Sequence, residues 1–226
     1  MNADVRDFRL ADVLTGRLAK MGDRPRRART RAALVAATAQ EMERSGIDGL
    51  TVARIAEVAG VAHGTFYLYF DNRIEAAMAV RRLYDAAIRL FRPRGGGELP
   101  PFEAIQRMNR FYVRSYANNA RLLRASQFLL YARPENAVRR DRINHRWSVA
   151  ILHDLKRRLI IDNFGPSGAT QTMLVRSAIA MADELLREIY IHRGPSLARL
   201  AGDQEQIANV ISRSWYRILY GADPPV

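Results

Sequence analysis

Apolar residues recur along this chain at spacings of three and four, which is the period of an amphipathic helix. The segment 29–45 is rich in alanine and shows that spacing at Leu34, Val35, Thr38 and Met42. Gly46 follows directly, and glycine commonly ends a helix because it adopts a positive φ without strain. The pattern therefore predicts a helix over residues 29–45.

The rest of the chain repeats this pattern between breaks that contain proline and glycine. The predicted helices cover residues 52–59, 62–70, 73–91, 102–118, 120–132, 135–164, 169–192 and 203–220. No segment alternates strictly between apolar and polar residues with β-branched enrichment, so no sheet is expected. The predicted class is all-α, with roughly nine helices.

The composition narrows the range of partners. With 36 lysine and arginine residues against 23 acidic ones, the formal charge is +13, which favours nucleic acid or another polyanion. A hydrophobic fraction of 48% is typical of a folded protein. The absence of cysteine excludes disulfides, thiolate metal sites and cysteine nucleophiles. Residues 1–20 carry three aspartates and no signal-peptide core, so a cytoplasmic protein is expected.

A cluster of positive charge precedes the first predicted helix and runs into it. The segment 20–31 contains only one acid, Asp23. Its basic residues are Lys20, Arg24, Arg26, Arg27, Arg29 and Arg31. One interpretation is a solvated tail. The other is an arm that lies along phosphates or reaches into a minor groove, in which case Arg27 and Arg29 would contact DNA.

The most informative segment covers residues 51–70 and has the pattern of a helix-turn-helix. Thr51 is a good N-cap for the first short helix, and Gly60 supplies the left-handed position that stops it. On the second short helix, Val61, Phe66 and Phe70 are predicted to face inward. That leaves four hydrogen-bonding side chains outside: His63, Thr65, Tyr67 and Tyr69. Gly64 lacks a β-carbon, which would let the backbone approach DNA closely. The alternative is that these side chains merely cover a helical hairpin.

From about Arg29 to Ala79 the chain resembles the tetracycline-repressor (TetR) family of bacterial transcriptional regulators. The residues that carry the resemblance are Gly46, Leu50-Thr51-Val52, Ile55-Ala56, Ala59-Gly60-Val61, Gly64-Thr65-Phe66-Tyr67, Tyr69-Phe70 and Arg73. The resemblance implies a dimer with an N-terminal three-helix DNA-binding domain and a C-terminal helical domain that binds an effector. It also implies dimerisation through the last two helices.

Carried over residue by residue, the resemblance implies phosphate contacts by Thr51, Tyr67, Tyr69 and Arg73. His63, Gly64 and Thr65 would lie nearest the bases. Two positions depart from the family pattern. Ala62-His63 stand where the family often has serine or proline followed by lysine or arginine, and Arg73 replaces the commoner lysine. These differences bear on base preference.

The domain boundaries are predicted as an extension at 1–24, a helix-turn-helix domain at 25–72, and an effector-binding and dimerisation domain at 73–226. Residues expected to line the pocket for a small hydrophobic or acyl-type effector are Met108, Phe111, Tyr112, Phe128, Tyr131 and Trp147. Apolar stripes on the last two helices are typical of core, and the resemblance assigns part of them to the dimer interface: Met181, Leu185, Ile189, Ile207, Ile211 and Trp215.

Two other classes of protein remain as alternatives. A helical enzyme is disfavoured because the four histidines are scattered and no metalloprotease, P-loop, nucleophile-elbow or dinucleotide signature is present. No catalytic residue, metal or cofactor is therefore expected. A basic adapter or membrane-surface protein would bind without sequence preference, and excess unrelated duplex would titrate it away.

Overall fold

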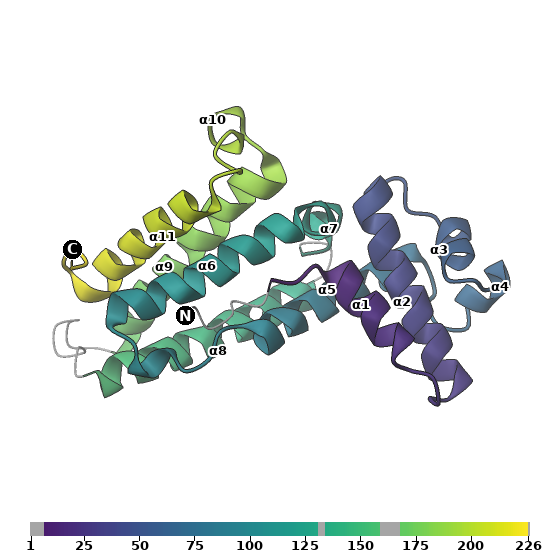
Figure 1. Cartoon of the computed structure of the whole chain (residues 1–226), viewed down its shortest axis with the longest axis horizontal. Helices are drawn as coiled ribbons and strands as arrows, with labels where there is room; N and C mark the ends of the chain where they lie inside the picture. Colours follow the sequence, from purple (N-terminus) through teal and green to yellow (C-terminus); the bar gives the residue numbers. More distant parts are fainter. Residues whose placement is uncertain (1–6, 131–133, 159–167, 226) are drawn as a thin grey trace. The chain divides into compact units, whose positions relative to one another are not determined.

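The computed structural model describes residues 7–130, 134–158 and 168–225, and every regular element in them is helical (Figure 1). The N-terminal α-helices are α1 (Leu10–Ala19), α2 (Arg26–Ser45), α3 (Val52–Val58), α4 (His63–Phe66) and α5 (Arg73–Phe91). They are followed by α6 (Pro101–Asn118), α7 (Ala120–Ser126), α8 (Pro134–Arg157), α9 (Gly168–Arg187), α10 (Pro195–Ala198) and α11 (Gln204–Tyr220). Short 3₁₀ segments lie at Gly96–Glu98 (η1) and Gln127–Leu130 (η2), and a π-helical turn, η4, covers Glu188–His192.

The all-α prediction is confirmed, and each predicted helix has a counterpart, with the predicted bounds at α5 and shifted ends elsewhere. The helix predicted at 62–70 is regular only over His63–Phe66. The one predicted at 135–164 ends at Arg157, and residues 159–164 lie outside the described residues. The sequence interpretation missed α1 and α10. Within the predicted extension, α1 buries Leu10, Ala11 and Leu14.

The chain divides into two compact units that do not follow the predicted boundaries. Residues 6–92 and 118–130 form one unit, called here the N-terminal unit. Residues 93–117 and 131–226 belong to the other, called here the C-terminal unit. Helices α5 and α7 therefore pack with the N-terminal helices, whereas the predicted division at 72/73 separates them. The predicted boundary at 72/73 separates a DNA-binding from an effector-binding role. That separation of roles stays a prediction.

Helix α2 is the centre of the N-terminal unit and packs against α1, α3, α5 and α7. Its buried apolar side chains include Val35, Ala36 and Ala37, and Leu34, Ala39 and Met42 are fully enclosed. The small alanines allow neighbouring helices to approach on several sides. Burial of apolar area on this scale is what holds short helices such as α3 in place, because helices of that length are marginal alone.

Asn119, just before α7, ties α1 to the unit. Its side-chain oxygen accepts a hydrogen bond from the Leu10 N–H at 2.7 Å, and its amide donates to the Phe8 carbonyl at 3.0 Å. Phe8 also stacks on Phe91 of α5, with ring centroids 5.1 Å apart. Asn119 is buried, so these two bonds satisfy backbone groups that water does not reach.

In the C-terminal unit, α9 packs against α8 and α11, and α6 is joined to α11 by polar contacts. The amide of Asn109 on α6 donates to the Ser212 hydroxyl on α11 at 3.1 Å, and both side chains are buried. Arg158 donates to the carbonyls of Gly96 and Leu99, which holds the η1 turn against the end of α8. Within the part of the chain that the structure describes, no helix combines the length and the apolar character needed to cross a bilayer.

Candidate nucleic-acid interface

Helix α3 begins at Thr51, as the sequence predicts. The Thr51 backbone is extended, and its hydroxyl accepts a hydrogen bond from the Arg54 N–H at 3.2 Å. This bond satisfies one of the free N–H groups at the helix start. The Thr51 side chain is exposed, so the hydroxyl is also accessible from solvent.

The turn between α3 and α4 depends on Gly60. This residue has φ +67°, the left-handed region that the sequence predicts for it. The Val61 N–H then donates back to the Ala56 carbonyl at 3.0 Å, which closes the turn and directs the chain into α4. Phe66 and Phe70 are almost fully buried, as predicted, and they anchor α4 in the core.

The exposed face of α4 differs in phase from the sequence prediction. His63 and Tyr67 are exposed as predicted, whereas Thr65 and Tyr69 are half-buried. Gly64 and Leu68 are exposed, and Leu68 was not singled out. The physical reason is that a helical turn repeats at positions i and i+4, so the outer face collects 63, 64, 67 and 68 rather than alternate residues.

The two exposed rings on this face are in contact. The His63 and Tyr67 rings meet edge to face, with centroids 5.6 Å apart. A β-carbon built on Gly64 meets nothing within 4 Å, so the backbone there is open to an approaching molecule. The result is a short helix end with two polar aromatic groups beside bare backbone.

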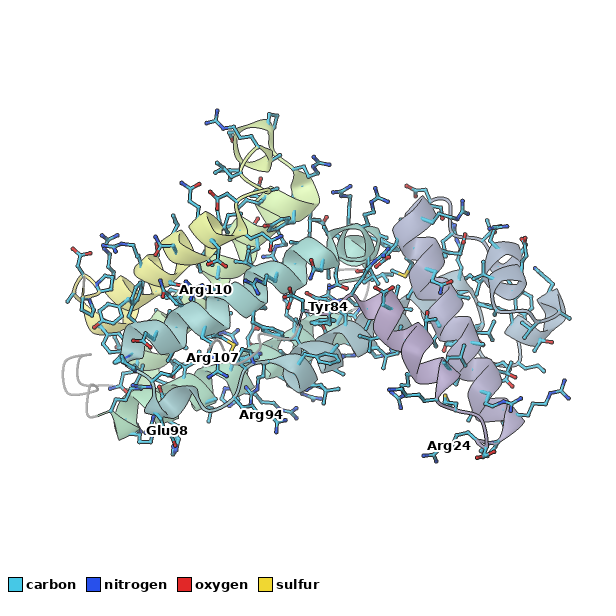
Figure 2. All side chains as sticks on the ribbon, in the orientation of Figure 1. Arg24, Tyr84, Arg94, Glu98, Arg107 and Arg110 are labelled. Carbon is cyan, nitrogen blue, oxygen red and sulfur yellow. The ribbon has the colours of Figure 1, made fainter. Side chains whose placement is uncertain are left out.

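The basic cluster is a turn and a helix start, not a free arm. Arg26 begins α2, and the Arg29 guanidinium donates to the Gly22 carbonyl at 2.8 Å across the turn from α1. Arg27 and Arg29 are exposed, as is Arg24, which lies at this turn (Figure 2). The first turn of α2 holds no acid, so these cations lie at the end of the helix where its dipole favours anions. A phosphate near this turn would relieve that unfavourable arrangement.

A cation–π contact connects the basic cluster to the end of the α4 segment. The Arg31 guanidinium lies over the Phe70 ring, 5.3 Å from its centroid. Arg27 lies one helical turn before Arg31 and therefore on the same side of α2. The N-terminal turns of α2 and the segment that follows α4 thus belong to one neighbourhood.

A buried carboxylate fixes α3 relative to α2. Glu41 of α2 binds Arg44 at 2.6 Å, and its carboxylate lies 3.7 Å from the Arg54 guanidinium of α3. The hydrogen bond from Arg44 holds the pKa of Glu41 below its ordinary value of 4.5. An ionised Glu41 therefore links the two helices at neutral pH.

Arg73 has a role that the sequence does not reveal. Its Nη1 donates to the carbonyl oxygens of Ile47, Asp48 and Leu50, with the shortest distance, 2.6 Å, to Leu50. Those carbonyls belong to the loop that leads into Thr51. The guanidinium at the start of α5 thus positions the start of α3, and the phosphate contact carried over from the family pattern stays a prediction.

Residues 34–75 match the family model described as "Bacterial regulatory proteins, tetR family". The match covers α3, α4 and the turns on either side, where Thr51 and Gly60 have the predicted geometry. This segment of the chain is therefore similar to the TetR family. No curated protein matches at the sequence level.

Solved structures show the same fold over most of the chain. A TetR-family transcriptional regulator from Streptomyces coelicolor is 21% identical, with a TM-score of 0.59, covering 87% of this chain and 90% of its own. A putative TetR-family regulator from Mesorhizobium loti is 15% identical, with a TM-score of 0.59 and coverage of 86% and 98%. The fatty acid degradation regulator FadR from Bacillus halodurans is 15% identical, with a TM-score of 0.57 and coverage of 85% and 95%.

The predicted effector residues are distributed over both units. Met108, Phe111, Tyr112 and Trp147 belong to the C-terminal unit, where Phe111 is buried and the other three are half-buried. The Tyr112 hydroxyl donates to Asp183 at 2.6 Å. Phe128 belongs to the N-terminal unit and is 42% exposed. Tyr131 lies outside the described residues.

The residues predicted for dimerisation differ in how much surface they expose. Ile189, Ile207 and Ile211 are buried within the chain's own fold, and Ile211 retains only 1% exposure. Side chains this enclosed pack inside the unit and offer a partner almost no surface. Met181, Leu185 and Trp215 are half-buried. The large exposed apolar side chains on the same two helices are Met173 at 70% and Val210 at 50%, which the sequence analysis did not select.

Among the described residues, one group has metal-ligand chemistry. The ligand atoms of Glu184, Glu188 and His192, on α9 and η4, lie within 4.8 Å of one another. Glu184 is already paired with Arg187 at 2.6 Å. The group is largely exposed, and the nearby cation already compensates the charge of one of its two carboxylates. We assign no metal to it.

Proposed function

We propose that this chain binds a two-fold-symmetric DNA operator as a homodimer and represses transcription in the cytoplasm. The observation that carries the proposal is the exposed face of α4 with His63, Gly64 and Tyr67, because Thr51 at the start of α3 and the arginines at the start of α2 are exposed as well. Groups of this kind suit DNA, because arginines and helix starts bind phosphates while the short helix reaches base edges.

A helical enzyme and a nonspecific basic protein are less well supported. Two of the solved structures with this fold are named TetR-family transcriptional regulators, and a third is named a fatty acid degradation regulator. A nonspecific binder would need the positive charge but not the ordered segment from Thr51 to Phe70. The order of cap, glycine turn and exposed helix face favours sequence-specific binding.

The effector proposal rests on the chain's helical C-terminal unit and on one structural relative. A TetR-fold protein named for fatty acid degradation supports an acyl-type effector here. Half-buried apolar groups of the C-terminal unit, among them Met108 and Trp147, are candidates for contact with it. A differential affinity of about 1–3 kcal/mol between the free and DNA-bound forms would be enough to change operator occupancy.

The Arg73 contacts supply a route for the effector signal inside the N-terminal unit. A shift of the first turn of α5 carries Arg73 with it, and Arg73 holds the carbonyls of residues 47–50. Movement of α5 would therefore displace the start of α3. In a dimer this displacement would change how two recognition segments fit half-sites about 34 Å apart.

Selection of DNA fragments from a random library tests the DNA part of the proposal. We expect enriched fragments with inverted symmetry that bind in the presence of excess unrelated duplex. The double variant Arg27→Glu/Arg29→Glu should lose retention, whereas Arg94→Glu, an exposed arginine of the C-terminal unit, should behave as wild type (Figure 2). Enrichment without symmetry, or none at all, would contradict the proposal.

The dimer part is tested by changing exposed residues only. Met173→Glu/Val210→Glu should give a monomer in analytical ultracentrifugation with an unchanged helical spectrum. Substitution of Ile211 is a poor test, because a charge at a buried position unfolds the unit whatever its role. A surviving dimer in the double variant would place the interface elsewhere.

A further inference from the structure

Leu68 is the most exposed large apolar side chain in the described part of the chain, at 72%. Its N–H donates to the Thr65 carbonyl at 3.2 Å, so the residue is fixed in the turn that ends α4. Its neighbours in sequence on the core side, Phe66 and Phe70, are buried. The backbone thus turns Leu68 away from the core by the same geometry that buries the two phenylalanines.

Leu68 lies on the same exposed face as Gly64, His63 and Tyr67. It follows Gly64 by four residues, so the two share one side of the helical turn. Space above Gly64 is open, because a β-carbon there would meet nothing within 4 Å. The polar groups of the face, His63 and Tyr67, lie beside this apolar strip with their rings in contact. Leu68 is therefore an apolar group that projects beside bare backbone.

A leucine side chain has no donor or acceptor, so it cannot distinguish bases by hydrogen bonds. The apolar group that the major groove offers is the 5-methyl of thymine, and contact with it removes apolar area from water on both sides. Burying Leu68 in this way would offset the cost of exposing it in the free protein.

We propose that Leu68 is a specificity-determining residue that reads a thymine methyl group in each operator half-site. This assignment rests on the proposed DNA-binding function, and it names the base that the face recognises. His63 and Tyr67 supply polar contacts to the same site, and Leu68 supplies the preference for thymine over cytosine or uracil at one position.

The test uses the full-length protein and a synthetic operator obtained from the library selection. Each thymine is replaced, one position at a time in both half-sites, by deoxyuridine, which pairs identically but lacks the methyl group. Wild-type affinity should fall about fourfold per half-site at one position, the effect of losing one buried methyl group. In Leu68→Ala this sensitivity should disappear at that position only. Leu90→Ala is the matched control, since Leu90 is 66% exposed on α5 and should keep the wild-type pattern.

Three results would overturn the proposal. The first is a flat deoxyuridine scan with the wild-type protein. The second is an operator without an invariant thymine in the half-site. The third is a Leu68→Ala variant that binds more weakly but keeps the full deoxyuridine effect, which would mean that Leu68 contacts the sugar rather than the base. Failure to select any operator is a different outcome, because it refutes the proposed DNA binding itself.

Discussion

Arg73 offers the sharpest test of how the structure assigns roles in the DNA-binding unit. The family pattern places a phosphate-binding cation at this position, whereas the structure has its Nη1 donate to three loop carbonyls. The substitution Arg73→Ala removes all three bonds. It leaves the carbonyls of residues 47–50 without their charged donor.

The size of the effect follows from the strongest of these bonds. A hydrogen bond that involves a charged group contributes about 1.5–3 kcal/mol. The 2.6 Å bond to the Leu50 carbonyl dominates, and the other two share the same nitrogen, so the sum is about 2 kcal/mol. For a chain of this size that loss lowers the Tm by about 4–8 °C.

The assay combines thermal unfolding with operator affinity at several salt concentrations. Arg73→Ala should lower the Tm and weaken binding. It should leave the slope of log K against log salt unchanged, because the Arg73 guanidinium binds backbone carbonyls rather than phosphate. Arg27→Ala is the contrasting variant. Its side chain is exposed and has no hydrogen bond or ion pair among the described residues, so the Tm should stay constant while the slope falls by about 0.9 per subunit, or about 1.8 for the dimer. If Arg73→Ala changes the slope by that amount and spares the Tm, Arg73 contacts phosphate and the reasoning is wrong.

Three further predictions follow from single residues. Gly64→Ala should leave stability unchanged or raise it by up to about 1 kcal/mol, because the new β-carbon meets nothing, yet it should reduce operator affinity at least about tenfold. Gly60→Ala should destabilise the protein instead, because Gly60 has φ +67°. Equal behaviour of the two variants would refute the argument that DNA approaches the backbone closely at Gly64. Asn119→Ala should cost about 2–4 kcal/mol in urea unfolding, because the Leu10 N–H and the Phe8 carbonyl lose their buried partner; a loss below about 0.5 kcal/mol would show that α1 is held by other contacts. Ionised Glu41 stabilises the fold above pH 4.5, and that stability is lost as the pH falls through its lowered folded pKa. Glu41→Gln should therefore be less stable than the wild type at pH 7 and lose less stability on acidification. Parallel profiles of stability against pH for the two proteins would exclude this role.

The helix-turn-helix could be predicted from the sequence because its signals are local. Thr51 caps α3 through a bond to a residue three positions later, and Gly60 has the positive φ that the pattern requires. The helical period likewise predicted the inward position of Phe66 and Phe70. Contacts of this kind depend on neighbours within one or two turns, and the order of residues alone specifies them.

Other features depend on partners far apart in the sequence. Helix α1 was missed because its stability comes from α2, Phe91 and Asn119, more than a hundred residues away in the last case. The carbonyl contacts of Arg73 span 23 to 26 residues, and no local pattern distinguishes them from a free cation.

The apolar stripes of α9 and α11 show the same limit. Periodicity identified an apolar face in both helices, yet it could not tell that Ile207 and Ile211 face the chain's own interior while Met173 and Val210 face outward. A stripe has the same period whether its partner is another helix of the same chain or a second subunit. The sequence by itself therefore determined most of the helices and the helix-turn-helix segment, and only the tertiary packing decided which surfaces remain to meet a partner.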